Sequence, residues 1–305
     1  MPFSYHTHSG QFCKHATGTL EEVVQQAIEV GYTHVGLSEH MPRKEPCDLY
    51  PEEEELHMTP ADLDQQFTDY VSEAKRLQRL YSSRIHILVG METEYIRPSC
   101  VQEILRLQEV HSLDYVVGSV HHVEGMAFDF DEEWFQRCEA RYSSLHAMCN
   151  VYYSDQFALL TQIQPHVVGH FDRIQVYQSD YKPDRAVWEA IQKNIKYCID
   201  YGALFEINTH YMASTGTGQP SPNTDILKCI VCSGGRLTLS DDCHAPAGVA
   251  ANYESVYDII RDHGLDDHIY CLEFDNTTKS LTQKPVHNFL QHPFWQKAGK
   301  SKCSV

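Results

Sequence analysis

Short runs of apolar and β-branched residues alternate with amphipathic helical segments along this chain, and this alternation constrains the fold more than any other feature. A strand, a helix and a further strand in succession are typical of a parallel α/β sheet. The chain has 305 residues, a length that suits one (β/α) barrel. The runs predict strands at residues 3–8, 33–38, 85–92, 114–120, 167–170, 203–208 and 236–240.

The segments between these runs predict helices and one insertion. Thr19 followed by Glu22 is a capping box that begins a helix, and Gly31 is expected to end it. The stretch 131–164 is longer than a single crossover needs, so we expect a helical insertion there, broken near Asn150. A further strand is expected at 269–274 and a polar tail from about 290. No change in composition indicates a linker, so residues 1–305 are interpreted as one domain.

Ionisable and polar residues stand where each predicted strand ends. In a (β/α) barrel these positions face the active site. Imidazoles and carboxylates gathered at one end of a barrel favour a multinuclear site for zinc, manganese or iron over separate structural roles. The strand-end residues are His6 and His8, Glu39 and His40, Glu92 and Glu94, His121 and His122, His170 with Asp172 and Arg173, Glu206 and Asn208, and Asp242 with His244.

Composition excludes several classes of protein. The net charge is -18, with 24 Lys and Arg against 42 Asp and Glu, and no basic cluster is available to bind nucleic acid. No run approaches the roughly 18 apolar residues of a membrane span. The first residues have no basic and no apolar stretch, so we expect no secretory signal. His6 lies so close to the start that a cleaved leader would remove part of the site, which favours a cytoplasmic location.

The 11 cysteines are odd in number and scattered, which is typical of reduced thiols in a cytoplasmic enzyme. Cys229 and Cys232 form a C-x-x-C without a second pair at zinc-ribbon spacing. We interpret them as helix residues that pack in the core, and the cysteines in general as non-catalytic.

The strand-end motifs, in their order along the chain, closely resemble the PHP (polymerase and histidinol phosphatase) superfamily. Gly-Ser-Val-His followed by the loop 123–130, together with Glu-Ile-Asn-Thr, resembles its histidinol-phosphate phosphatase branch. The resemblance implies a distorted TIM-like (β/α)7 barrel with three divalent metal ions at the carboxyl ends of the strands. The motifs are HTH (6–8), SEH (38–40), GME (90–92), GSVHH (118–122), VGHFD (168–172), FEINT (205–209) and SDDCH (240–244).

The resemblance also implies which residues bind each ion. His15 is expected among them, although it lies in a loop where some relatives carry Asp. Asp242 is preferred over Asp241 because Asp-x-His places both side chains on one face. The first ion is assigned to His6, His8, Glu92 and Asp242, the second to Glu92, His121 and His170, and the third to His15, His40 and His244.

Clustered divalent cations suit the hydrolysis of a phosphate ester. They lower the pKa of a bridging water, so that hydroxide exists near neutral pH, and they hold the phosphoryl oxygens. Three such ions with two carboxylate ligands leave a local charge of about +4, which attracts a phosphomonoester to an acidic protein. The resemblance predicts a histidinol-phosphatase of histidine biosynthesis. The bridging hydroxide would attack phosphorus and release L-histidinol and phosphate from L-histidinol phosphate.

The remaining candidates would bind the substrate. Arg173 suits a phosphate clamp, with a structural salt bridge to Asp172 as the alternative. Asp172 is a candidate to protonate the leaving alkoxide. The amine and imidazole of the substrate require carboxylates and apolar walls. Plausible partners, each of which has an ordinary loop position as its alternative, are Glu94, Glu124, Asp129, Phe12, Phe128 and Tyr211.

Three other interpretations stay open at this point. A PHP phosphoesterase of the same fold could act on another small phosphomonoester, a nucleotide or a 3′ nucleic-acid end, and phosphate release would separate these substrates. A metal-dependent amidohydrolase also opens with His-x-His, but it does not explain the second ligand type in Asp242-Cys243-His244. A non-catalytic metal-binding protein on the same scaffold should have lost ligands, and none of the nine expected positions has.

Overall fold

The computed structural model describes residues 2–178, 180–210, 212, 218–275 and 280–298. Its centre is a seven-stranded sheet in the order β1-β2-β3-β4-β7-β8-β9, in which all neighbours are parallel. Parallel pairing is the outcome that the alternation of strands and helices predicted. The strands are β1 (Phe3–Ser4), β2 (His34–Leu37), β3 (His86–Glu92), β4 (Tyr115–Gly118), β7 (Val167–Val168), β8 (Leu204–Asn208) and β9 (Arg236–Ser240).

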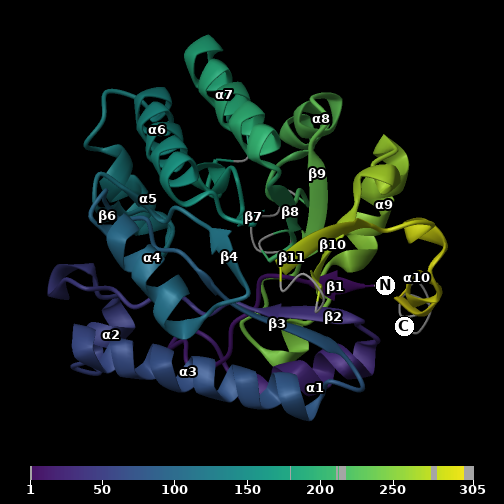
Figure 1. Cartoon of the computed structure of the whole chain (residues 1–305). Coiled ribbons are helices and arrows are strands. Elements are labelled where there is room, and N and C mark those ends of the chain that lie inside the picture. The colour runs from purple at the N-terminus through teal and green to yellow at the C-terminus, as the bar shows by residue number, and fades with distance from the viewer. Residues whose placement is uncertain (1, 179, 211, 213–217, 276–279, 299–305) are drawn as a thin grey trace, which may run out of the picture.

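The first and last strands of this sheet come together and nearly close it into a barrel (Figure 1). The amide of Tyr5 donates to the carbonyl of Leu239 at 3.4 Å, and the amide of His8 donates to Cys243 at 2.8 Å. Thr7 also forms a parallel bridge with Cys243. Because the strands are parallel, their carboxyl ends meet at one rim of the barrel. The expected (β/α)7 barrel is confirmed.

Helices surround the strands on the outside (Figure 1). The helix expected after Thr19 is present, with Thr19 and Glu22 bonded reciprocally and Gly31 in the left-handed conformation at its end (φ 97°). Within the described residues, no helix combines the length and apolar character needed to cross a bilayer. The larger helices are α1 (Leu20–Val30), α3 (Pro60–Leu80), α4 (Cys100–His111), α6 (Leu145–Ile163), α7 (Arg185–Tyr201), α8 (Thr224–Cys232) and α9 (Tyr253–His263).

The insertion between β4 and β7 differs in detail from the expectation. It contains a small hairpin, β5 (His122–Val123) with β6 (Met126–Ala127), and then α5 (Glu132–Glu139) and α6. The break lies at residues 140–144, not near Asn150, because Ser144 caps the start of α6 by accepting from the amide of Ala147. Between β2 and β3, residues 51–55 form the short helix α2 (Pro51–Glu55). The 3₁₀ turns η1 (Pro46–Asp48) and η2 (Arg173–Gln175) also lie in the connections between strands.

The C-terminal region confirms one expectation and corrects another. The strand expected at 269–274 exists as β10 (Tyr270–Asp275), but it pairs antiparallel with β11 (Ser280–Pro285) outside the barrel sheet. The tail is not polar from 290, because α10 (Pro293–Ala298) buries Phe294 and Trp295 against Tyr253. Amphipathic character over so few residues is too weak to be recognised in the sequence.

Tyr115 on β4 occupies the space inside the barrel beside β2 and β3. Its ring is fully buried, and its hydroxyl donates to the carbonyl of Tyr5 at 2.8 Å. A Cβ at Gly36 would lie 2.3 Å from the Tyr115 hydroxyl oxygen, and one at Gly90 would lie 2.4 Å from the ring carbon Cε1. Both strands therefore require glycine where the ring passes. Because Tyr5 directly precedes His6, this packing also fixes where the first strand ends and where His6 lies at the rim.

The variant Gly36→Ala should lose about 1–3 kcal/mol of unfolding free energy, because the new methyl group overpacks the barrel interior. Urea denaturation followed by circular dichroism measures this loss. Adding Tyr115→Phe removes the nearest atom, so the double variant should be less destabilised than the sum of the two single variants. Strict additivity would contradict the proposed contact.

Candidate metal centre

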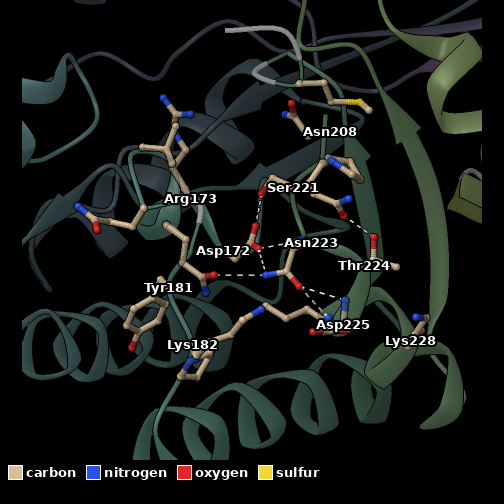
Figure 2. A pocket seen from close by; sticks show the side chains of 18 of the residues that line it. Asp172, Arg173, Tyr181, Lys182, Asn208, Ser221, Asn223, Thr224, Asp225 and Lys228 are labelled. Carbon is tan, nitrogen blue, oxygen red and sulfur yellow. Dashed lines mark hydrogen bonds between the residues drawn. The ribbon is translucent and has the colours of Figure 1, made fainter. Parts of the chain in front are cut away.

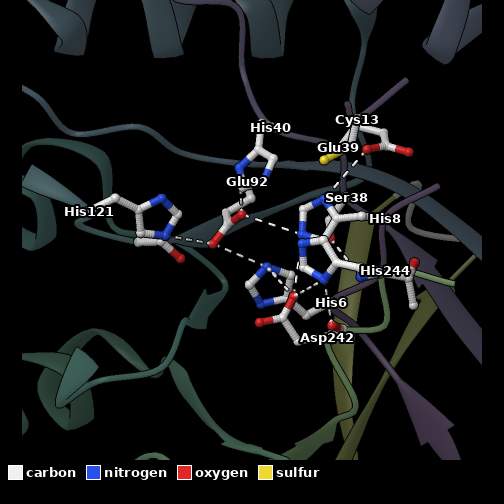
Figure 3. A network of polar contacts seen from close by, with 12 residues as sticks. His6, His8, Cys13, Ser38, Glu39, His40, Glu92, His121, Asp242 and His244 are labelled. Carbon is white, nitrogen blue, oxygen red and sulfur yellow. Dashed lines mark hydrogen bonds and ion pairs between the residues drawn. The ribbon is translucent and has the colours of Figure 1, made fainter. Parts of the chain in front are cut away.

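The strand-end histidines and carboxylates predicted from the sequence converge at the rim of the barrel (Figure 3). Several overlapping groups of them have ligand atoms within 4.8 Å of one another. The side chains of His6, His8 and Glu92 are essentially fully buried. Residues far apart in the chain thus form one compact cluster because their strands are neighbours in the barrel. Its members include His6, His8, His15, His40, Glu92, Glu94, His121, His170, Asp242 and His244.

Glu92, at the end of β3, lies at the centre of the cluster. Its Oε1 is 3.1 Å from the Nε2 atoms of His6, His121 and His170. Its Oε2 is 2.9 Å from Nδ1 of His40 and 3.4 Å from Nε2 of His8. One carboxylate therefore faces imidazoles from β1, β2, β4 and β7 and their loops. This is the geometry of a bridging ligand.

Asp242, rather than Asp241, joins the cluster. Its Oδ1 lies 3.4 Å from Nε2 of His8 and 3.6 Å from Nε2 of His6. Asp241 points elsewhere and accepts hydrogen bonds from the hydroxyl of Tyr32 at 2.6 Å and of Ser4 at 2.9 Å. The backbone of Asp242 adopts a left-handed conformation (φ 46°), an uncommon one for this residue type, and this turn directs the two neighbouring carboxylates apart.

His15, His40 and His244 lie together at one side of the cluster, and Cys13 joins them within the same 4.8 Å limit. Cys13 was not expected to take part in the site. Burial alone would raise the pKa of its thiol, but the neighbouring imidazoles of His15 and His40 outweigh burial and lower that pKa to about 7. In turn, Cys13 and Glu52 raise the pKa of His15 to about 9 against the effect of burial.

Carboxylates and a carbonyl hold the outer nitrogens of the histidine rings. Glu206 lies 3.1 Å from Nδ1 of His6, and Glu94 lies 3.1 Å from Nδ1 of His121. Nδ1 of His15 bonds to Glu52 at 2.8 Å, and Nδ1 of His244 bonds to the carbonyl oxygen of Asp242 at 2.9 Å. Histidines that bind metals commonly have such a partner on the second ring nitrogen. Glu206 and Glu94 were visible at strand ends in the sequence, but only the distances show that they contact the outer ring nitrogens.

Charges in the cluster shift the acidities of its members. Burial alone would lower the pKa of His6, but Asp242, Glu92 and Glu206 raise it well above its usual range. Burial would likewise raise the pKa of Glu92, but His6, His121 and His40 hold it well below its usual range. Without ions, the carboxylates thus favour protonated imidazoles. Binding of divalent ions would replace these protons.

The donor set fits divalent metal ions. Buried atoms without a hydrogen-bond partner in the described part of the chain include Nε2 of His6, both ring nitrogens of His8 and of His40, Oε2 of Glu92 and Oδ1 of Asp242. Orphaned polar atoms are costly inside a protein unless a ligand satisfies them. Imidazole and carboxylate donors are suited to zinc, manganese and iron.

The residues predicted to contact the substrate lie in different places in the structure. Glu94 lies within the cluster, 2.8 Å from Nδ1 of His40. Glu124 is exposed and accepts from the hydroxyl of Tyr142. Phe128 is fully buried against Tyr152 and cannot form a pocket wall. The placements of Glu124 and Phe128 depend on the hairpin of β5 and β6, which the sequence did not reveal.

Phe12 and Tyr211 complete this set. Phe12 lines a small depression beside His15 and His40, together with Tyr50 and Arg43. Tyr211 lies outside the described residues. Tyr50 and Arg43 were not expected at the site. The hydroxyl of Tyr50 donates to Glu94 at 2.9 Å, and the guanidinium of Arg43 stacks over the Tyr50 ring at 4.4 Å.

Arg173 and Asp172 do not form the salt bridge considered as an alternative. Nε of Arg173 donates to Asp129 at 2.8 Å. Asp172 accepts from the hydroxyl of Ser221 at 2.5 Å and from the amide and side chain of Asn223 at 2.9 and 3.0 Å (Figure 2). Asp172 thus ties η2 to the start of α8, and burial raises its pKa although these hydrogen bonds oppose the shift.

A cavity of about 530 Å³ lies beside these residues (Figure 2). It reaches the metal cluster at Asn208, whose side-chain amide donates to Asp242 at 3.0 Å and to Glu206 at 2.9 Å. Its size falls in the range of small-molecule pockets. Its lining includes Asp172, Arg173, Trp188, Met212 and Asp225.

Glu92→Gln should lower the number of divalent ions that the folded protein retains, because one carboxylate faces several of the imidazole ligands. Elemental analysis after loading with zinc and dialysis measures this number, and circular dichroism checks the fold. Glu124→Gln changes the same chemical group at an exposed position and should leave the metal content unchanged. Equal metal content in both variants would contradict a bridging role for Glu92.

Comparison with known proteins agrees with the motifs. A probable histidinol-phosphatase of Schizosaccharomyces pombe is 44% identical over 259 residues, which cover 83% of this chain and 84% of that protein. The histidinol-phosphatase of Saccharomyces cerevisiae is 28% identical over 96% of this chain and 98% of its own length.

A solved structure has the same fold. The histidinol phosphate phosphatase of Lactococcus lactis, determined with zinc, L-histidinol and phosphate, aligns with a TM-score of 0.66 and 18% identity over 92% of this chain and 98% of its own. Residues 4–210 match the PHP domain family. With that match over most of its length and the 44% identity to the fission yeast protein, the chain belongs to the PHP domain family.

Proposed function

We propose that this protein is a metal-dependent phosphomonoesterase that hydrolyses L-histidinol phosphate to L-histidinol and phosphate in histidine biosynthesis. The convergence of imidazoles and carboxylates around Glu92 carries the proposal, because the chain that builds it is 44% identical to a probable histidinol-phosphatase. The zinc, L-histidinol and phosphate in the Lactococcus lactis structure support the same metal class and substrate here. The described cysteines are free thiols, which suits a cytoplasmic enzyme.

Three divalent ions, of zinc, manganese or iron, fit the proposed ligands. Bound divalent ions supply two effects to such a reaction, since they lower the pKa of water and neutralise the charge of the phosphoryl oxygens. Support comes from the orphaned atoms of the cluster and from the overlapping groups that share its members. The proposed sets are His6, His8, Glu92 and Asp242, then Glu92, His121 and His170, and lastly His15, His40 and His244.

The surrounding carboxylates position the imidazoles. Glu206 holds Nδ1 of His6 and also accepts from the amide of His170 at 2.6 Å, so one side chain fixes two ligands. Glu39 accepts from the amide of Ser9 at 2.8 Å and faces Nδ1 of His8 at 3.4 Å. With Nδ1 of His6 engaged, its ring presents Nε2 to the cluster in a fixed orientation. The residues themselves thus prepare the site before the ions bind.

Arg173 is proposed to bind a phosphoryl oxygen. It follows His170 by three residues, its side chain is 3% exposed, and Asp129 orients it through Nε. A guanidinium matches phosphate oxygens in charge and shape. We place the organic part of the substrate in the adjacent cavity, where Trp188 and Met212 offer apolar surface and Asp225 offers negative charge to an amine.

Asp172 is assigned a positioning role in place of proton donation to the leaving alkoxide. Both of its oxygens already accept hydrogen bonds, from Ser221 and Asn223. Because donors from the protein itself engage both oxygens, neither is directed to the oxygen of a leaving group. Through these bonds Asp172 holds η2, and with it Arg173, against the start of α8.

Purified protein should release phosphate from L-histidinol phosphate much faster than from AMP or a 3′-phosphorylated oligonucleotide. A strong chelator should abolish release, and added zinc or manganese should restore it. A malachite green assay at matched substrate concentrations measures each rate. A preference for either nucleotide substrate would replace the proposed substrate while leaving the family assignment intact.

Arg173→Lys should lower kcat/KM for L-histidinol phosphate by about 10- to 100-fold, because an ammonium cannot reproduce a planar two-pronged contact with phosphate. The bound metal content should stay the same, which elemental analysis checks. Arg185→Lys is the matched control, since the side chain of Arg185 is 93% exposed and pairs with Glu189 on the outer surface of α7. Wild-type kinetics in Arg173→Lys would remove Arg173 from the substrate contacts.

A further inference from the structure

The third proposed ion site contains a side chain to which the sequence motifs assign no role. Cys13 lies with His15, His40 and His244, and the four ligand atoms are within 4.8 Å of one another. The Sγ atom is 3.1 Å from Nε2 of His15. The residue is only 5% exposed, so its sulfur faces the cluster and not the solvent (Figure 3). A metal-binding role for Cys13 requires that the third ion of the proposed function is bound by His15, His40 and His244.

The loop that carries Cys13 is held tightly against the rim. The amide of Cys13 donates to the carbonyl of Ser9 at 2.8 Å, and the amide of Thr17 donates to the carbonyl of His244 at 2.8 Å. Gly10 is required there, because a Cβ would lie 2.5 Å from Cα of Thr17. These contacts bring Cys13 and His15 to His244, and the sulfur position is therefore part of the folded loop.

The three neighbouring histidines are arranged as metal ligands. His15 and His244 each use Nδ1 for an outer hydrogen bond, to Glu52 and to the carbonyl of Asp242, which leaves Nε2 to bind an ion. The buried Nε2 of His40 has no hydrogen-bond partner in the described part of the chain. The nitrogen of His15 that would bind the ion is the one beside the sulfur. The sulfur of Cys13 therefore lies on the side of the three histidines where their ion-binding nitrogens are found.

We propose that Cys13 is the fourth ligand of the third ion and makes it a His₃Cys site that prefers zinc. Three imidazoles and one sulfur match the tetrahedral coordination of zinc. On binding, the sulfur–zinc bond forms, the S–H bond breaks and the proton leaves to solvent. A thiolate is a soft donor and disfavours manganese, whereas the other two sites offer imidazole and carboxylate alone. The cluster is thus chemically asymmetric.

Cobalt(II) tests this proposal on the full-length protein. Cobalt replaces zinc in such sites, and a cobalt–thiolate bond adds a charge-transfer absorption in the near ultraviolet that nitrogen and oxygen ligands do not produce. The wild-type protein, loaded anaerobically with cobalt, should show this band, and Cys13→Ser should lose it. Zinc affinity at the weakest site should fall at least about tenfold in Cys13→Ser, measured by competition with a chelator.

Cys232→Ser is the matched control. Cys232 is an exposed thiol that forms a C-x-x-C with Cys229 and is another place where cobalt could bind sulfur. This variant should keep the band. A wild-type protein without the band, or a band that survives in Cys13→Ser and disappears in Cys232→Ser, would overturn the proposal. If Cys13→Ser fails to fold, a wild-type spectrum without the band still overturns the proposal, and a band that Cys232→Ser keeps supports it.

The outcome is separable from that of the proposed function. If the band depends on Cys13 but L-histidinol phosphate is not hydrolysed, the ligand assignment stands and the substrate assignment fails. If the wild-type protein hydrolyses L-histidinol phosphate but shows no cobalt–thiolate band, the function stands and Cys13 is only a hydrogen-bond partner of His15.

Discussion

The buried carboxylate of Glu92 is the interaction on which the rest of the site depends. A charge in the interior is tolerated only when opposite charges or ligands compensate it. Glu92 is 1% exposed and faces histidines from four other strand ends. Each of those histidines is correctly placed only if its own strand ends at the same height. The register β3–β4, in which Glu92 pairs with Val117, sets this height, and a shift of one residue would turn Glu92 to the opposite face.

Packing inside the barrel holds the strands whose ends carry the histidines. Tyr115 passes between the strands where Gly36 and Gly90 leave room for its ring, and its hydroxyl bonds the backbone of Tyr5, one residue before His6. Above it, Glu206 and Glu39 orient the rings of His6 and His8. Apolar packing fixes the strands and carboxylates fix the rings. The metal-binding atoms are therefore placed by two independent sets of contacts.

The sequence predicted which side chains gather at the rim, because most of them follow a strand whose direction and end are themselves recognisable. The same logic failed for residues 123–128. Phe128 and Glu124 follow His122 closely in sequence, yet the hairpin of β5 and β6 places Phe128 against Tyr152 and leaves Glu124 exposed. Proximity along the chain to a ligand is a poor guide once the backbone turns. A salt bridge between Arg173 and Asp172 was one expectation, but the long side chain of Arg173 reaches Asp129 instead.

The sequence by itself determined the parallel (β/α) architecture, the rim at which the chemistry is gathered and the identity of most ligand candidates, because strand periodicity and strand-end positions are local properties of the chain. The Asp-x-His spacing already favoured Asp242 over Asp241, and the tertiary structure adds the left-handed turn at Asp242 that separates the two carboxylates. Only the tertiary structure decided that Glu206 and Glu39 orient rings, and that Cys13 joins His15, His40 and His244. These are contacts between residues far apart in the chain, and they exist only once the barrel has closed.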